Sequence, residues 1–111
     1  MIFKIVPRDL WAKAERDRRF DGAPVDLQDG FIHFSTASQL AETAAKHFAG
    51  QTDLVLVAVD EQRLGQWLKW EVSRNDELFP HLYACLALEM VEWVKPLPWT
   101  GTAHAIPDGV V

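Results

Sequence analysis

Cysteine is almost absent from this sequence, which carries one, Cys85, among 111 residues. A lone cysteine cannot close an internal disulfide, and its neighbours Ala84 and Leu86 predict that it is a small buried side chain. One cysteine and four scattered histidines also lack the ligand spacing of a structural zinc site, so we expect no metal centre. A chain without disulfides suits a reducing compartment, and we expect a cytoplasmic protein.

Basic charge is scarce as well. Eleven Lys and Arg residues against sixteen Asp and Glu residues give a net charge of -5. Because non-specific binding to a phosphate backbone depends on clustered cations, nucleic acid is not expected as a partner. The one dense basic run, residues 16–19, is typical of a solvated helix end, and the alternative for it is an anion-binding role.

Long apolar runs and phosphate-binding glycine motifs are missing too. No apolar stretch approaches the roughly 20 residues that cross a bilayer, and the start lacks the pattern of a signal peptide, so we expect neither export nor membrane association. The glycines do not form a Gly-rich phosphate loop, and no Gly-x-Ser-x-Gly elbow occurs. These absences disfavour classical nucleotide-hydrolysing and serine-hydrolase sites.

The residues that are present predict one α+β domain over residues 1–111, with a hydrophobic content of 49% to supply its core. The expected elements are strands at 1–6, 31–35, 54–59, 67–72, 83–88 and 90–94, helices after Pro7 and from Thr36, a loop at 20–30 and a loose surface tail at 100–111. The uninterrupted apolar run 54–59 predicts a central strand covered on both faces, and 67–72 predicts a half-buried strand. Most of the five tryptophans are expected in the core, with Trp99 as the one that lines a pocket or a partner surface.

Polar groups converge where a predicted strand meets a predicted helix. Alternation along the strand places Phe31, His33 and Ser35 on one face. Thr36 and Gln39 form a capping box, and the helix start behind it favours an anion or a polarised carbonyl. These groups either face a ligand or serve only as caps around a semi-buried histidine.

Two later segments carry further candidates. Glu71 ends an alternating strand on the side of Trp67, so it is either a surface glutamate or a partly desolvated carboxylate with a raised pKa. His81 and Tyr83 lie on one side of a short extended segment, where they line a cleft or act as amphipathic plugs. We predict that these side chains share one cleft with the segment at residues 33–36.

Several spaced segments resemble the family catalogued as domain of unknown function 952, and the resemblance covers most of the chain to about Tyr83. The matching segments are Ile2 to Pro7, Trp11, Asp29 to Thr36, Gln39-Leu40, Thr43-Ala44, Phe48, Asp53 to Leu56, Trp70-Glu71 and Phe79 to Tyr83.

The resemblance implies a fold and a reaction. The family looks related to the ADP-ribosyltransferase-like superfamily, which implies a split, mostly antiparallel β-barrel with two main helices and a cleft that holds NAD in active members. Carried over by position, the working residues are Lys4 on the first strand, Ser35 at the strand-to-helix junction and Glu71 at a strand end. The implied function is nucleotide binding with ADP-ribosyl transfer or cleavage of the NAD glycosidic bond; NAD is then a substrate, and no cofactor is firmly implied.

The sequence departs from the family pattern at Lys4, where relatives commonly have histidine. The catalytic candidates are therefore Glu71, Ser35 and His33, and the ligand-binding candidates are Lys4, Thr36, His81 and Tyr83. The expected partner is a small-molecule nucleotide, and the oligomeric state stays open. Two alternatives remain: a non-catalytic module on the same fold that binds a small ligand or a protein, and an RNA end-processing activity, which the acidic charge balance disfavours.

Overall fold

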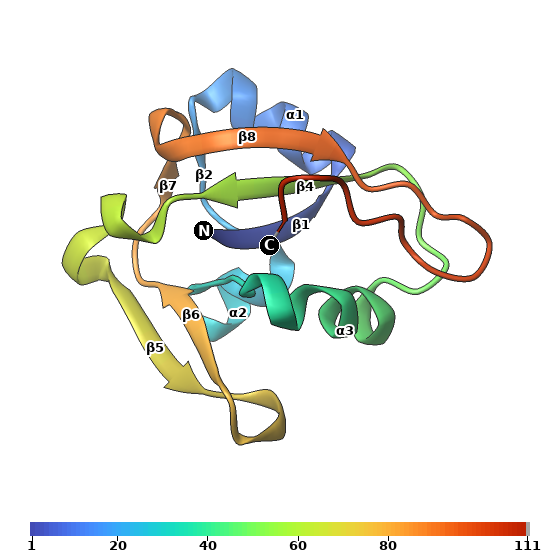
Figure 1. Ribbon diagram of the computed structural model, residues 1–111. Coiled ribbons are helices and arrows are strands. Elements are labelled where there is room, and N and C mark those ends of the chain that lie inside the picture. Colours follow the sequence, from blue (N-terminus) through green and yellow to red (C-terminus); the bar gives the residue numbers. More distant parts are fainter. Residues whose placement is uncertain (111) are drawn as a thin grey trace.

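A three-stranded antiparallel sheet, in the order β1-β4-β8, lies at the centre of the fold (Figure 1). The computed structural model describes residues 1–110. The sheet consists of β1 (Ile2–Pro7), β4 (Leu54–Val59) and β8 (Val91–Pro96). Every residue of β4 is buried, because the strand pairs on both sides and both of its faces are covered. The central position that its apolar run predicts is confirmed.

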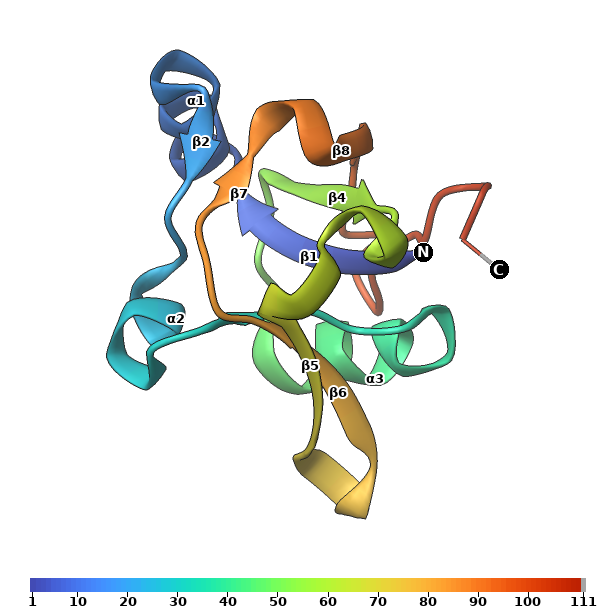
Figure 2. The same ribbon diagram turned by 90° about the vertical axis from the view of Figure 1, so that its left-hand side faces the viewer.

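Two helices cover the opposite faces of this sheet (Figures 1 and 2). Trp11 and Ala14 of α1 (Arg8–Asp17) share one core cluster with the odd-numbered valines of β4. Leu40 and Ala44 of α3 (Ala37–His47) share the other cluster with the even-numbered residues of β4. Alternating side chains of one strand therefore feed two separate cores.

A second antiparallel sheet, in the order β3-β6-β5, forms beside the first. It contains β3 (Ile32–His33), β6 (Leu78–Leu82) and β5 (Leu68–Val72), and the hairpin of β5 and β6 projects from the body of the molecule (Figure 2). The third sheet pairs β2 (Arg19–Phe20) with β7 (Leu86–Ala87).

Within residues 1–110 these strands form three small sheets and no closed barrel, which corrects the expected split barrel. The first two sheets meet at a single bridge between Phe3 and Ser35. The amide of Phe34 still donates to the carbonyl of Pro80 on β6 at 3.0 Å, whereas the amide of Ser35 donates to the carbonyl of Phe3 on β1 at 2.8 Å. The chain thus passes from one sheet to the other within two residues. The pairing between the two sheets is too short to join them into one barrel.

A third helix, α2 (Pro24–Asp29), occupies most of the predicted loop at residues 20–30, so the expected pair of helices becomes three. The sequence predicted a loop because proline and aspartate are common in turns, but both residue types are also favoured at the start of a helix. Pro24 opens the helix, and the carboxylate of Asp26 accepts from the amide of Ala23 at 2.7 Å. Gly30 ends it in a left-handed conformation, with φ of 87°.

The prediction for the tryptophans was wrong, since Trp11 alone among the five is fully buried. Trp70 is 44% exposed because β5 is an edge strand on the projecting hairpin, and Trp67, in the short turn just before β5, is 54% exposed. The expected half-buried β5 is therefore mostly exposed. Cys85 is exposed as well, contrary to its predicted burial.

The tail after β8 contacts the rest of the protein at several points, contrary to the loose surface tail that the sequence predicted. Trp99 pairs with His104, whose ring contacts the carbonyl of Gln51 at 3.0 Å, and Lys95 donates to the carbonyl of Asp108 at 2.8 Å. The last residue of the predicted tail, 111, lies outside the described part. No helix among residues 1–110 has the length and apolar character to cross a membrane.

Candidate functional site

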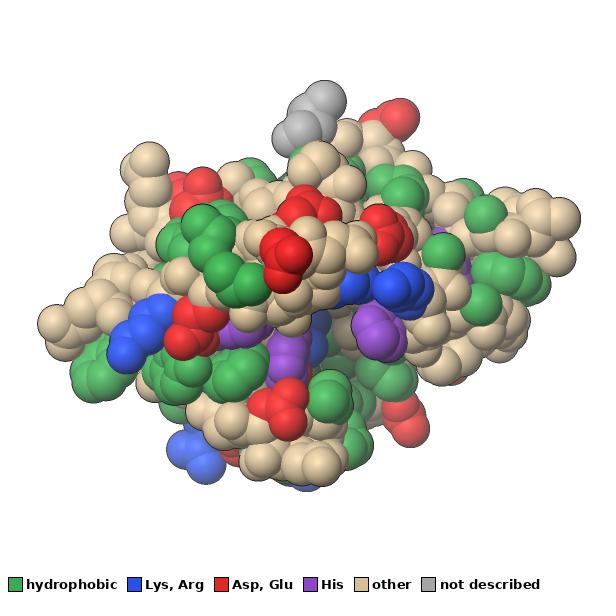
Figure 3. All heavy atoms as spheres, turned by 90° about the horizontal axis from the view of Figure 1, so that it is seen from below, with side chains coloured by type: hydrophobic (Ala, Val, Ile, Leu, Met, Phe, Trp, Pro, Cys, Tyr) green, Lys and Arg blue, Asp and Glu red, His purple; other side chains and the backbone are tan. Residues whose placement is uncertain are grey.

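A pocket of about 490 Å³ opens where β1, α3 and the sheet of β3 and β6 meet. Its polar lining includes Lys4, His33, Ser35, His81 and Arg74, and its walls include several phenylalanines. Seen from below, histidine side chains gather in the middle of this face, next to Lys and Arg and bordered by acidic residues (Figure 3). The volume falls within the usual range for small-molecule sites.

The strand registers explain why distant candidates converge. His33 on β3 pairs with His81 on β6, Glu71 on β5 pairs with Phe79 on β6, and Ser35 pairs with Phe3 on β1. Four of the seven candidates line the pocket: Lys4, His33, Ser35 and His81.

The other three candidates lie outside the pocket lining. Glu71 lies behind the lining, where its carboxylate contacts His81, which does line the pocket. The hydroxyl of Tyr83 donates to the same carboxylate. Thr36 stands at the start of α3, where its amide donates to Oε1 of Gln39 at 3.0 Å and its hydroxyl contacts that of Ser38 at 3.2 Å. The geometry favours a capping role for Thr36.

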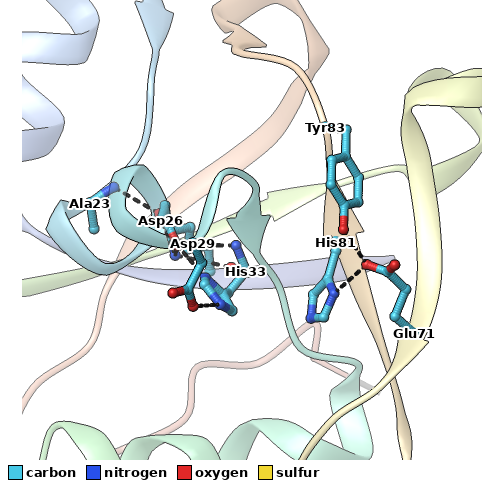
Figure 4. Close-up of polar contacts among 8 residues, drawn as sticks. Ala23, Asp26, Asp29, His33, Glu71, His81 and Tyr83 are labelled. Carbon is cyan, nitrogen blue, oxygen red and sulfur yellow. Dashed lines mark hydrogen bonds and ion pairs between the residues drawn. The ribbon is translucent and has the colours of Figure 1, made fainter.

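A buried carboxylate that sequence reasoning missed, Asp26, anchors one side of the site (Figure 4). Its side chain lies 3.0 Å from Nζ of Lys4, which also donates to the carbonyl of His33 at 3.0 Å. Asp26 Oδ1 accepts from the amide of His33 at 3.1 Å and lies 2.6 Å from Nδ1 of the same residue. Lys4 therefore holds the site together instead of presenting a free cation to a ligand.

Glycine at position 22 permits this close packing. Gly22 has φ of +125°, and a Cβ placed there would lie 2.8 Å from Cβ of Asp26. A side chain would clash with Asp26 and strain the backbone. Gly22 thus belongs to the site, although the sequence shows it only as a turn former.

Carboxylates lie at both nitrogens of the His33 ring. Asp26 stands at Nδ1, and Oδ2 of Asp29 lies 3.0 Å from Nε2. A histidine can donate to two carboxylates at once only in its charged form. His33 thus has no nitrogen left for a ligand unless Asp29 moves away.

Burial and the charge of the partner act in opposite directions on the pKa values of Lys4 and Asp26. Burial lowers the pKa of the Lys4 ammonium, and the neighbouring Asp26 partly offsets this. Burial acts to raise the pKa of Asp26, but the hydrogen bond from His33, the charge of Lys4 and two backbone amides outweigh it, so the pKa of Asp26 lies below its usual value. Asp26 therefore stays ionised at a lower pH than an ordinary aspartate does.

Acid is expected to weaken the fold through this group. Because the folded-state pKa of Asp26 is lowered, its contribution to stability is complete above the ordinary aspartate pKa and is lost as the pH falls through the lowered value. Urea unfolding from about pH 6 down to about pH 2 should show a shallower loss of unfolding free energy in Asp26→Asn than in the native protein. Equal losses in the two proteins would remove Asp26 from this account.

Glu71, His81 and Tyr83 form a second polar cluster (Figure 4). Oε1 of Glu71 accepts from the hydroxyl of Tyr83 at 2.7 Å and lies 2.8 Å from Nδ1 of His81. The hydrogen bond from Tyr83, followed by that from His81, lowers the pKa of Glu71, and the same contact raises the pKa of Tyr83. Of the two alternatives for Glu71, the desolvated carboxylate with a raised pKa is therefore wrong, because the hydrogen bonds from Tyr83 and His81 outweigh desolvation.

Phe31 packs against the aromatic groups of both clusters. Its ring stacks on His81 with centroids 4.1 Å apart, and its centroid lies 4.6 Å from that of His33 and 5.1 Å from that of Tyr83. The predicted alternation did place Phe31 on the face of His33. Phe31 therefore contacts the rings of both histidines.

Hydroxyls and a guanidinium shape the end of the pocket near α3. Ser35 Oγ lies 2.9 Å from Oγ1 of Thr43, which also accepts from Nη2 of Arg74 at 3.0 Å. Arg74 packs over the ring of Phe79 at 4.9 Å and pairs with Glu42 at 3.1 Å. Among residues 1–110, no group of three or more His, Cys, Asp and Glu residues is arranged to hold a metal ion.

Residues 5–94 match the model of the family described as "Protein of unknown function (DUF952)". The chain belongs to the DUF952 family. A crystal structure of protein CC0527 from Caulobacter crescentus is 46% identical and superposes with a TM-score of 0.90, covering 94% of this chain and 92% of the other. The solution NMR structure of CC0527 is 47% identical, with a TM-score of 0.84 and coverage of 93% and 89%. No curated protein matches the chain.

Proposed function

We propose that the pocket binds a nucleotide, with NAD as the substrate, and that Glu71 acts on the ribose as the bond to nicotinamide breaks. The observation that carries the proposal is one ionised carboxylate, fixed by Tyr83 and His81, beside an apolar-walled cavity of about 490 Å³. The choice of NAD takes its support from the resemblance to ADP-ribosyltransferase-like enzymes. The outcome is ADP-ribosyl transfer or hydrolysis, depending on the acceptor.

The state of Glu71 suits this role. Cleavage of the glycosidic bond develops positive charge on the ribose, and a preorganised carboxylate stabilises such charge. Glu71 is ionised at neutral pH, and the hydrogen bonds from Tyr83 and His81 lower its pKa below the ordinary glutamate value. Oε1 is occupied by Tyr83 and His81, whereas Oε2 makes no hydrogen bond within residues 1–110 and is available to a ribose hydroxyl.

The lining suits a planar ring. Phe3, Phe34 and Phe79 supply apolar surface, and the hydroxyl of Ser35 lies among them with His33 near by. We assign Ser35 to the nicotinamide side of the ligand, where the His33 ring, held by Asp26 and Asp29, shapes the wall. Lys4 contributes by holding Asp26 and the carbonyl of His33.

Calorimetric titration tests the binding step. NAD, ADP-ribose and nicotinamide are titrated separately, and NAD is expected to bind with a Kd between about 1 μM and about 1 mM, the range in which Michaelis constants usually fall. Free nicotinamide should then accumulate when the protein is incubated with NAD. The absence of heat with all three compounds, together with the absence of released nicotinamide, would end the proposal.

A second candidate function is a non-catalytic module that binds a small ligand. One observation favours it: Lys4, His33 and Arg74 all have carboxylate partners within the protein, so much of the polar lining is already satisfied. This candidate predicts binding of NAD or ADP-ribose with no release of nicotinamide.

A further inference from the structure

His81 differs from the other polar groups of the pocket in how its ring is used. It is 5% exposed and lines the pocket, and its Nδ1 lies 2.8 Å from Oε1 of Glu71. The other ring nitrogen faces away from Glu71 (Figure 4) and makes no hydrogen bond among residues 1–110. When one nitrogen of a buried histidine is hydrogen-bonded to a carboxylate and the other has no partner, the lone pair of the second nitrogen has a fixed direction.

The contacts around the ring fix which nitrogen carries the proton. A carboxylate accepts hydrogen bonds and cannot donate them, so the neutral ring donates from Nδ1 and leaves Nε2 as the base. Tyr83 holds the same carboxylate oxygen from a second direction at 2.7 Å. Phe31 stacks on the imidazole, with the ring centroids 4.1 Å apart. This is the arrangement of a histidine oriented by a carboxylate.

The other groups of the lining do not offer a free, oriented base. Both nitrogens of His33 face carboxylates, and Lys4 is paired with Asp26. The hydroxyl of Ser35 is bonded to that of Thr43. His47, on the last turn of α3, is exposed and has no carboxylate partner among residues 1–110.

We infer that Nε2 of His81 accepts the proton of the attacking water or acceptor hydroxyl, with Glu71 and Tyr83 positioning the ring. This inference rests on the proposed function. The oxygen of the acceptor forms a bond to C1′ of the ribose, and the bond from C1′ to the nicotinamide nitrogen breaks. Its electron pair leaves with neutral nicotinamide, and the proton of the acceptor passes to Nε2.

The position of the ring proton can be measured without any substrate. Nitrogen-15 NMR of the neutral His81 ring is expected to show the proton on Nδ1 in the native protein and a redistribution toward Nε2 in Glu71→Gln. A native ring with its proton on Nε2 overturns the inference, whatever the protein does with NAD.

Turnover tests the proton transfer itself. His81→Ala is expected to release nicotinamide about 10²-fold more slowly than the native protein or worse, while NAD binds within a few-fold of the native Kd. Added imidazole should restore part of the rate in His81→Ala and leave the native rate unchanged. A native-like rate in His81→Ala, or loss of NAD binding in step with turnover, would show that the ring has only a structural role.

A second variant covers the case in which His81→Ala folds poorly. His81→Asn retains a polar side chain that can donate to Glu71 but supplies no base, so it should fold and bind NAD with the same loss of rate. A native protein that places the proton on Nδ1 but releases no nicotinamide refutes the proposed reaction and, with it, proton transfer by His81. A native protein that releases nicotinamide at the same rate as His81→Asn refutes the role of His81 alone.

Discussion

Asp26→Ala is expected to lower the free energy of unfolding by about 3–5 kcal/mol, the range observed when one partner of a buried ion pair is removed. The substitution leaves the ammonium of Lys4, a residue that is 8% exposed, without its carboxylate. It also deprives two amides and Nδ1 of His33 of their acceptor. Urea unfolding followed by tryptophan fluorescence measures the change.

Two variants control for this prediction. Asp29→Ala removes an exposed carboxylate from the other nitrogen of the same histidine, and its expected cost is below about 1 kcal/mol. Lys4→Met should cost less than Asp26→Ala, because Asp26 keeps its contacts to His33 and to Ala23. A loss in Asp26→Ala no larger than that in Asp29→Ala would contradict the anchoring role of Asp26.

Glu71→Gln is expected to reduce the release of nicotinamide from NAD by about 10²- to 10³-fold, the usual effect of removing one preorganised electrostatic group. The amide is nearly isosteric and leaves the fold intact, but it carries no charge to stabilise the ribose. NAD should still bind, because the pocket walls come from other residues. The assay measures nicotinamide at saturating NAD, and calorimetry measures the Kd.

Glu77→Gln is the matched control, since it changes a glutamate on the same hairpin whose exposed side chain makes no hydrogen bond within residues 1–110. Its rate should equal that of the native protein. Equal rates in Glu71→Gln and the native protein would remove Glu71 from the mechanism while leaving the pocket as a binding site.

The framework of the central sheet and its helices was predictable because it depends on local patterns. The apolar run of β4 and the repeats of Trp11 and Leu40 on their helices report burial directly, and all three patterns are confirmed. The hairpin of β5 and β6 was harder. Trp70 alternates as a core residue does, but an edge strand that projects from the body leaves it exposed.

The site was predictable only in part. Alternation placed His33 beside Ser35 and His81 beside Tyr83, and the strand registers then brought the two histidine rings to a centroid distance of 5.4 Å. Asp26 could not be found this way, because its lysine partner is 22 positions away and its neighbours resemble a loop. The sequence also left the pKa of Glu71 open, since the hydrogen bonds that lower it come from His81 on β6 and from Tyr83 just beyond that strand.

The central claim, that NAD occupies the pocket between β1, α3 and β6, is tested most directly by mapping amide chemical shifts during a titration with NAD. The largest shifts are expected at residues 33–35, 43–48 and 71–83, in a pattern that saturates with one Kd. The hollow of about 250 Å³ beside Trp99 and His104 serves as an internal reference, and its amides should stay in place. Shifts confined to that second hollow, or none anywhere, would show that NAD does not occupy the pocket.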